Sequence, residues 1–133
     1  MYKKRRVVIT GMGAVTPIGI GVQEYWQGLV EGRNGVDLIT HFDTTKFAAE
    51  VKNFTPEDYL DKKAARRMDR FCQFAVATAD MAMKDSGMNL ENIDRDRFGV
   101  IYGSGIGGMK TLQEQHFNFF NGLDPRKISP FFI

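Results

Sequence analysis

Apolar and polar positions divide the chain into short apolar runs, glycine-rich loops and longer stretches with helical spacing. Two runs, residues 6–10 and 100–102, have the length and the β-branched content of buried strands. Helical spacing of apolar residues follows at residues 22–31, 63–86 and 109–120. Strands that alternate with helices along a chain predict an α/β protein.

Local signals set the ends of these helices. Gly32 stops the first helix, and Gly87 follows the second at the position that usually adopts the left-handed conformation. Thr55 lies before a proline and two acidic residues, which predicts a short helix there. Asp61 is placed to cap the helix that comes next.

Two segments carry little periodic signal. Residues 11–21 form a loop that is too long, and too broken by proline, to start a helix at once. Because a phosphate-binding turn needs the helix start directly behind its glycines, we interpret Gly11 and Gly13 as turn glycines. Residues 33–52 are predicted to be irregular, with a short extended piece near residues 36–39.

The central helix is apolar almost all round between Phe71 and Met83, which predicts burial on several sides. Cys72 is interpreted as a small core residue, since it lies past the N-terminal turn where helix dipoles activate thiols. The basic start of the helix is expected to lower the pKa of this thiol slightly. His41 and His116 accompany no nucleophile, and we interpret both as structural or exposed residues.

A glycine-rich stretch, Gly103-Ser-Gly-Ile-Gly-Gly108, follows the second apolar run. Gly103, Gly105 and Gly108 satisfy G-x-G-x-x-G, so an NAD(P)-binding α/β domain is one hypothesis. Such a domain also needs a second strand that ends in an acidic residue about 20 residues further on. The sequence has a loop there, with Asp124 before a proline, and this removes most of the support for the hypothesis. A tight turn with close helix–sheet packing and no ligand is the alternative.

Composition narrows the class of protein. A length of 133 residues suits one domain, and 43% hydrophobic and 26% charged residues are ordinary for a globular protein. A net charge of +2 by itself predicts nothing about nucleic acid, and we expect no nucleic-acid partner. The single cysteine excludes an internal disulfide and suits a reducing compartment. No run approaches the roughly 20 apolar residues of a membrane helix, so we expect a cytoplasmic protein without a membrane partner.

Cations gather at the start of the central helix. Those with i, i+3, i+4, i+7 spacing, which would share one helix face, are Lys63, Arg66, Arg67 and Arg70. A second basic pair, Arg126-Lys127, lies in a proline-containing loop near the end of the chain. Charge alone leaves two interpretations open, a solvated helix end and a docking surface for an acidic partner.

Several motifs in matching order resemble the elongating β-ketoacyl-acyl-carrier-protein synthases, the condensing enzymes of fatty acid synthesis. They are Arg6-Val-Val-Ile-Thr-Gly-Met-Gly-Ala-Val-Thr-Pro-Ile-Gly19, Phe42-Asp-Thr44, Arg67-Met-Asp69, Asp85-Ser-Gly87, the Gly103–Gly108 stretch and Arg126-Lys-Ile-Ser-Pro-Phe-Phe132. The resemblance implies a thiolase-like layered α/β/α sandwich. Residues 1–133 would supply most of its first half, as part of the N-terminal domain.

The resemblance also implies a function. In the family, a cysteine thiolate receives an acyl chain, and two histidines help malonyl-carrier protein to decarboxylate and condense with it. Cys72, His41 and His116 match none of these positions, so we expect no catalytic residue in this stretch. Ile106 and Phe132 match residues of the family's acyl pocket. The positions that match its docking surface for acyl carrier protein are Lys63, Arg66, Arg67, Arg126 and Lys127. We expect a homodimer that uses no cofactor or metal.

The last residues, 128–133, are strongly apolar, which predicts that this is the front part of a longer chain. Alone, the stretch is expected to expose hydrophobic surface and to aggregate or stay molten. A noncatalytic remnant that at most binds carrier protein is therefore the alternative to an enzyme.

Overall fold

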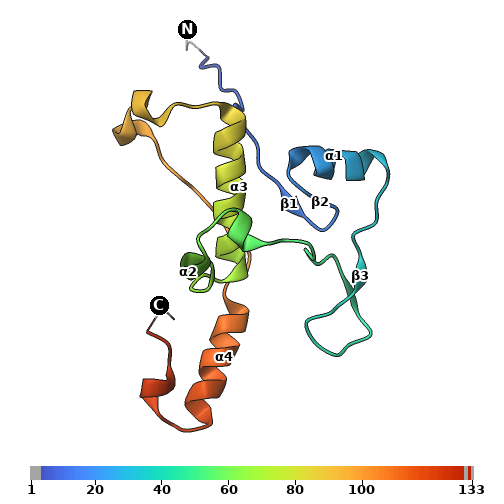
Figure 1. Cartoon of the computed structure of the whole chain (residues 1–133), viewed down its shortest axis with the longest axis vertical. Coiled ribbons are helices and arrows are strands. Elements are labelled where there is room, and N and C mark those ends of the chain that lie inside the picture. The colour runs from blue at the N-terminus through green and yellow to red at the C-terminus, as the bar shows by residue number, and fades with distance from the viewer. Residues whose placement is uncertain (1–3, 131, 133) are drawn as a thin grey trace.

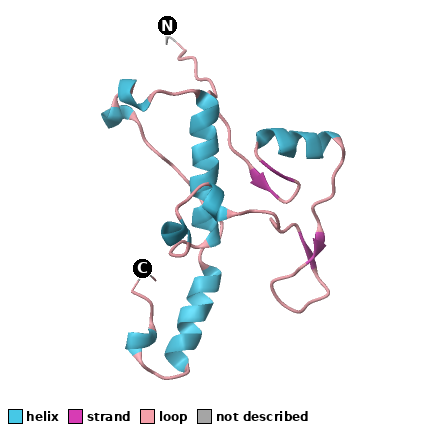
Figure 2. Ribbon diagram, viewed as in Figure 1, coloured by secondary structure: helices cyan, strands magenta, loops and turns pink. Residues whose placement is uncertain are grey.

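The computed structural model describes residues 4–130 and 132. Helix α3 (Arg70–Ser86) forms the long axis of the molecule, and α4 (Met109–Phe120) continues beyond its N-terminal end (Figure 1). Helix α1 (Val22–Val30) and the strands lie to one side of this axis, as the colouring by secondary structure also shows (Figure 2). The helices predicted from apolar spacing at residues 22–31 and 109–120 are confirmed.

The strands of the described residues form two small antiparallel hairpins. In the first, β1 (Val15–Thr16) pairs with β2 (Gly19–Ile20), and in the second, β3 (Asp37–Leu38) pairs with β4 (Phe47–Ala48). The second hairpin confirms the extended piece expected near residues 36–39.

Gly11 and Gly13 have a role that differs from the predicted one. Neither has a positive φ, and both lie directly against α3. A Cβ on Gly11 would come within 2.2 Å of the Ala82 carbonyl oxygen, and one on Gly13 within 2.1 Å of the Thr78 carbonyl oxygen. These glycines are therefore required by the close approach of two backbones and not by a turn.

The predicted continuous helix over residues 63–86 is broken. Helix α2 (Lys62–Ala65) follows the 3₁₀ turn η1 (Pro56–Asp58) and ends before α3 begins. Asp61 caps α2 as predicted, accepting hydrogen bonds from the amides of Lys63 and Ala64 at 3.0 and 2.9 Å. The Gln73 side chain stabilises the break, because its amide donates to the carbonyls of Ala65 and Met68 at 2.8 and 3.2 Å.

The hydrophobic core of the described residues is small. It consists of Phe54, Ala65 and Ala77, which are 7%, 3% and 0% exposed. The Phe54 ring contacts the ring of Phe74 edge-on at 4.9 Å. Ala77 is the only buried residue that α3 contributes among the described residues, so the expected burial of this helix on several sides is not observed. The described helices and strands therefore cover only part of the apolar surface of α3.

The two predicted buried strands are also absent from the described part of the chain. Residues 6–10 and 100–102 have no regular secondary structure and belong to no ladder among the described residues. Ile101 is 100% exposed and Val7 90% exposed. The physical reason is that a strand needs a hydrogen-bonded neighbour, and no described segment pairs with either run.

Short 3₁₀ turns connect the remaining elements: η2 (Leu90–Asn92), η3 (Arg95–Arg97) and η4 (Pro125–Lys127). Gly87 ends α3 in the left-handed conformation with φ 60°, as predicted. Over residues 4–130 and 132, no helix has the length and apolar character needed to cross a membrane.

Candidate functional site

The cations singled out from the sequence come from two parts of the chain that are distant in the sequence. We call them the basic surface: Lys63, Arg66, Arg67, Arg126 and Lys127, all exposed. Lys63 belongs to α2, Arg66 and Arg67 to the turn that follows it, and the last two to η4. Because the helix is broken, the face predicted from i, i+3, i+4, i+7 spacing does not exist.

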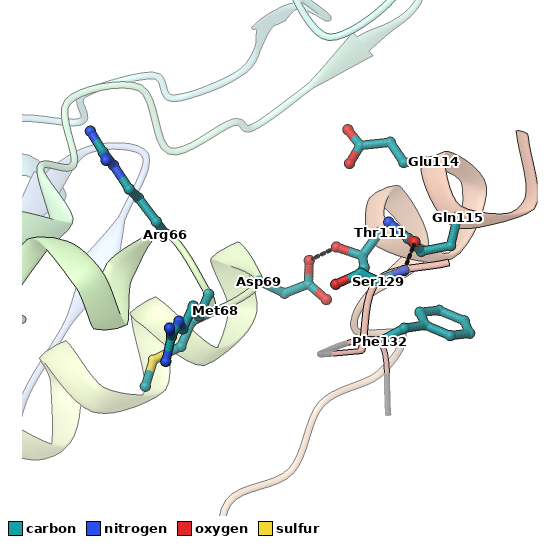
Figure 3. Close-up of a pocket in the computed structure, with 9 residues that line it drawn as sticks. Arg66, Met68, Asp69, Thr111, Glu114, Gln115, Ser129 and Phe132 are labelled. Atoms are coloured by element: carbon teal, nitrogen blue, oxygen red, sulfur yellow. Dashed lines mark hydrogen bonds between the residues drawn. The ribbon is translucent and has the colours of Figure 1, made fainter. Parts of the chain in front are cut away.

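A shallow pocket of about 250 Å³ brings the turn after α2 together with the C-terminal segment (Figure 3). Arg66 lies on one side of it, and Ser129 and Phe132 on the other; Arg67 also lines the pocket. In Figure 1 the chain after η4 turns back towards α2. The pocket thus includes the two arginines of the turn and the segment that follows Arg126 and Lys127 in the chain.

Side-chain hydrogen bonds hold the pocket together. The Thr111 hydroxyl of α4 donates to the carboxylate of Asp69, which precedes α3. The Ser129 amide donates to Gln115 Oε1 at 2.6 Å. Both contacts are partly buried, and both are visible in Figure 3. Asp69, Thr111 and Gln115 thereby connect α3, α4 and the C-terminal segment.

Arg70 does not belong to the basic surface, although the sequence placed it on the same face. Its guanidinium lies 5.0 Å from the centre of the Phe74 ring and 5.8 Å from that of Phe54. It also donates a hydrogen bond to the Val51 carbonyl at 2.5 Å. Arg70 therefore packs against the small core and joins it to the segment before η1.

Arg126 is oriented by an acidic neighbour. Its Nε and Nη2 atoms donate to the two carboxylate oxygens of Asp124 at 3.0 Å each. These hydrogen bonds lower the pKa of Asp124 and raise that of Arg126. The guanidinium is 90% exposed, so it remains accessible to solvent while it is held in one direction.

The structure does not bring the two expected acyl-pocket residues into one described pocket. Phe132 is 37% exposed and lines the pocket beside Arg66 and Arg67. Ile106 is 80% exposed in the glycine-rich segment before α4. A role of either residue in acyl binding stays a prediction.

Cys72 and the histidines form no catalytic constellation in the described chain. Partial burial, and secondarily the negative charge of Asp69, raise the pKa of Cys72, so the expected slight lowering was wrong. His41 is exposed with Nε2 3.9 Å from Glu50 Oε1, and the His116 ring lies tilted against the Phe120 ring, with centroids 4.4 Å apart. No cluster of metal-ligating side chains occurs among the described residues.

Sequence reasoning missed the residues that organise the pocket. The sequence interpretation gave Asp69 no role as a helix cap, although aspartate before a helical run is a common N-cap signal. That signal could have located the break. Thr111 and Gln115 gave no comparable signal, because their partners lie 42 and 14 residues away in the sequence.

The family model described as beta-ketoacyl synthase, N-terminal domain, matches residues 4–132. The chain therefore belongs to the β-ketoacyl synthase family. This membership overturns the hypothesis of an NAD(P)-binding domain that rested on Gly103, Gly105 and Gly108.

Curated relatives make the assignment more specific. The chain is 47% identical to 3-oxoacyl-[acyl-carrier-protein] synthase 2 of Synechocystis sp., over 98% of this chain and 32% of the relative. It is also 47% identical to the protein of that name from Staphylococcus aureus, over 100% of this chain and 33% of the relative. The chain thus spans about one third of the length of these relatives.

Solved structures confirm the predicted ketosynthase fold of thiolase-like type. The ishigamide ketosynthase/chain length factor matches with a TM-score of 0.78 and 33% identity, over 98% of this chain and 33% of that one. A beta-ketoacyl synthase from Burkholderia phymatum matches with a TM-score of 0.74 and 30% identity, over 97% of this chain and 33% of that one. A type II polyketide ketosynthase solved with its acyl-carrier protein has a TM-score of 0.76 at 21% identity, over 96% and 34%, which supports the fold alone.

Proposed function

We propose that these residues are part of the N-terminal domain of a 3-oxoacyl-[acyl-carrier-protein] synthase of fatty acid biosynthesis. The intact protein transfers an acyl chain from the thioester of acyl-carrier protein to a cysteine thiolate outside the 133 residues, and the carrier leaves as its thiolate. Malonyl-carrier protein then loses CO₂, and its carbanion attacks the acyl thioester to give 3-oxoacyl-carrier protein and the free thiolate. The 47% identity over nearly the whole chain is the observation that carries this proposal.

The role of this part of the protein is to receive acyl carrier protein on the basic surface. Its cations are exposed on α2, the following turn and η4, and their charge complements an acidic partner. The intact protein is proposed to be a cytoplasmic homodimer that works without a cofactor.

Ile106 and Phe132 are proposed to contact the acyl chain, and Ile106→Phe should disfavour long acyl substrates over short ones.

The experiment uses the intact protein, acyl-carrier protein and malonyl-carrier protein, with 3-oxoacyl product as the readout. Arg66→Glu and Lys127→Glu are each expected to raise KM for carrier-bound substrate about 10-fold, since each puts a like charge opposite the acidic partner. Lys46→Glu, on an exposed residue before β4, is the matched control and should leave KM unchanged.

The outcomes separate the proposal from its alternative. Product formation by the wild-type protein, lost selectively on charge reversal, supports a condensing enzyme. Carrier binding without product supports a noncatalytic remnant. Absence of both binding and product would overturn the proposed function.

A further inference from the structure

Helices α3 and α4 meet N-terminus to N-terminus. The N-cap of α3 is Asp69 and that of α4 is Gly108, and a Cβ on Gly108 would lie 3.1 Å from Asp69 Oδ2. A Cβ on Gly107 would likewise lie 2.9 Å from the Phe71 ring. Figure 1 shows α4 continuing from this end of α3. Two positive helix-dipole ends therefore face one another at the junction.

Asp69 lies between these two positive ends. Its side chain caps no amide of α3; instead it accepts a hydrogen bond from the Thr111 hydroxyl in the first turn of α4. A carboxylate in this place offsets the repulsion of the two dipoles and joins the helices through one short polar contact. Asp69 thus fixes α4 relative to α3.

The same residue ends the turn that carries two cations of the basic surface. Arg66 and Arg67 occupy the positions just before Met68 and Asp69, and all four line the pocket. On the other side, the Gln115 contact one turn further along α4 holds the Ser129 amide. A chain of contacts runs from the arginine turn, through Asp69 and α4, to the C-terminal segment.

We propose that Asp69 is a positioning residue for carrier-protein docking, acting through Thr111 to hold the Arg66–Arg67 turn in register with the C-terminal segment. This inference rests on the proposed function. Asp69 contacts no substrate; it sets the direction in which the two arginines are presented. Loss of the contact should weaken docking without altering the reaction of an acyl group delivered without its carrier.

The test uses the intact protein and two probes, acyl-carrier protein and the corresponding acyl-pantetheine thioester. Asp69→Ala and Thr111→Val are expected to raise KM for acyl-carrier protein about 10-fold and to leave KM for acyl-pantetheine within about two-fold. Thr111→Ser keeps the hydroxyl and should behave like the wild type. Asp80→Asn, at a half-buried carboxylate of α3 paired with Lys84, is the matched control.

A double-mutant cycle with Arg66→Ala, read as the Kd for acyl-carrier protein, shows whether Asp69 acts through the arginine turn. Arg66→Ala should weaken binding less in the Asp69→Ala background than in the wild type. In that background Arg66 is no longer held in position for the carrier protein, so its removal costs less affinity. Additive losses would overturn the inference. So would equal increases in KM for both probes, which indicate a purely structural defect. A wild-type protein that neither condenses nor binds carrier protein would instead overturn the proposed function, and this inference with it.

Discussion

The backbone amide of Met12 donates a hydrogen bond to the Asp85 carboxylate at 2.9 Å, across 73 positions of the sequence. This contact ties the N-terminal loop to the last turn of α3, at the place where Gly11 and Gly13 pass directly over the helix. The hydrogen bond therefore holds the segment Gly11–Gly13 against the end of α3, where the Asp85-Ser-Gly87 motif lies.

Asp85→Ala should therefore lower the free energy of unfolding of the intact protein by about 1 kcal/mol, since Met12 loses its acceptor at an exposed site. Urea unfolding measures the change. Asp80→Ala removes a carboxylate from the same helix that accepts a hydrogen bond from Lys84 in an ion pair, and its effect should be smaller. Equal losses for the two variants would show that the Met12 contact contributes nothing.

Gly13→Ala should destabilise the protein by about 2 kcal/mol or more, because its Cβ would overlap the Thr78 carbonyl oxygen and two backbones would have to separate. Gly103→Ala is the matched control, as no atom lies within 4 Å of a Cβ placed there. Thermal unfolding of both variants checks the prediction. A Gly13→Ala protein with wild-type stability would contradict the close approach.

The Cys72 thiol should react slowly with iodoacetamide near pH 7. Partial burial and the charge of Asp69 raise its pKa, so the thiolate forms only above the ordinary range of about 8.5. Mass spectrometry after timed alkylation across pH gives the apparent pKa. Asp69→Asn removes the negative neighbour and should shift the titration downwards; an unchanged curve would exclude the electrostatic contribution.

Cys72→Ala should leave the condensing activity of the intact protein within about two-fold of the wild-type value, since the residue is interpreted as packing and not as a nucleophile. The rate of 3-oxoacyl product formation is the measurement. A loss of several orders of magnitude, with unchanged stability, would make Cys72 the acyl acceptor after all.

The Asp124 carboxyl should titrate below the ordinary aspartate value of about 3.9, because Arg126 stabilises its charged form. A lowered pKa in the folded state stabilises the fold at any pH above the ordinary value. That contribution is lost as the pH falls through the lowered pKa. Carboxyl chemical shifts measured against pH check this, and Arg126→Ala should return Asp124 towards the ordinary value.

Local sequence signals were sufficient to predict most of the helices of this chain. Features that depend on contacts between distant segments were predicted less well. The caps at Asp61 and Gly87 and the extent of α4 follow from neighbouring residues, so the sequence was sufficient for them. The break before α3 depends on Gln73 and Asp69 finding partners in other elements. The predicted strands at residues 6–10 and 100–102 depend on neighbours that no described segment supplies.

The candidate site was predicted in part. Each cation of the basic surface was identified from charge and resemblance, and all of them are exposed. Their arrangement was not predictable, because the assumed continuous helix placed Arg70 among them, whereas its guanidinium packs on Phe74. The contacts of Asp69, Thr111 and Gln115 lie between elements distant in sequence, where periodicity carries no information.

The meeting of α3 and α4 at their N-terminal ends gathers positive charge at one place on the molecule. Two helix dipoles and the neighbouring arginines contribute positive potential there, and the carboxylate of Asp69 offsets part of it. A field of this kind acts on an anionic partner before contact and guides it during diffusion. Added salt should therefore slow the association of such a partner far more than it hastens its departure.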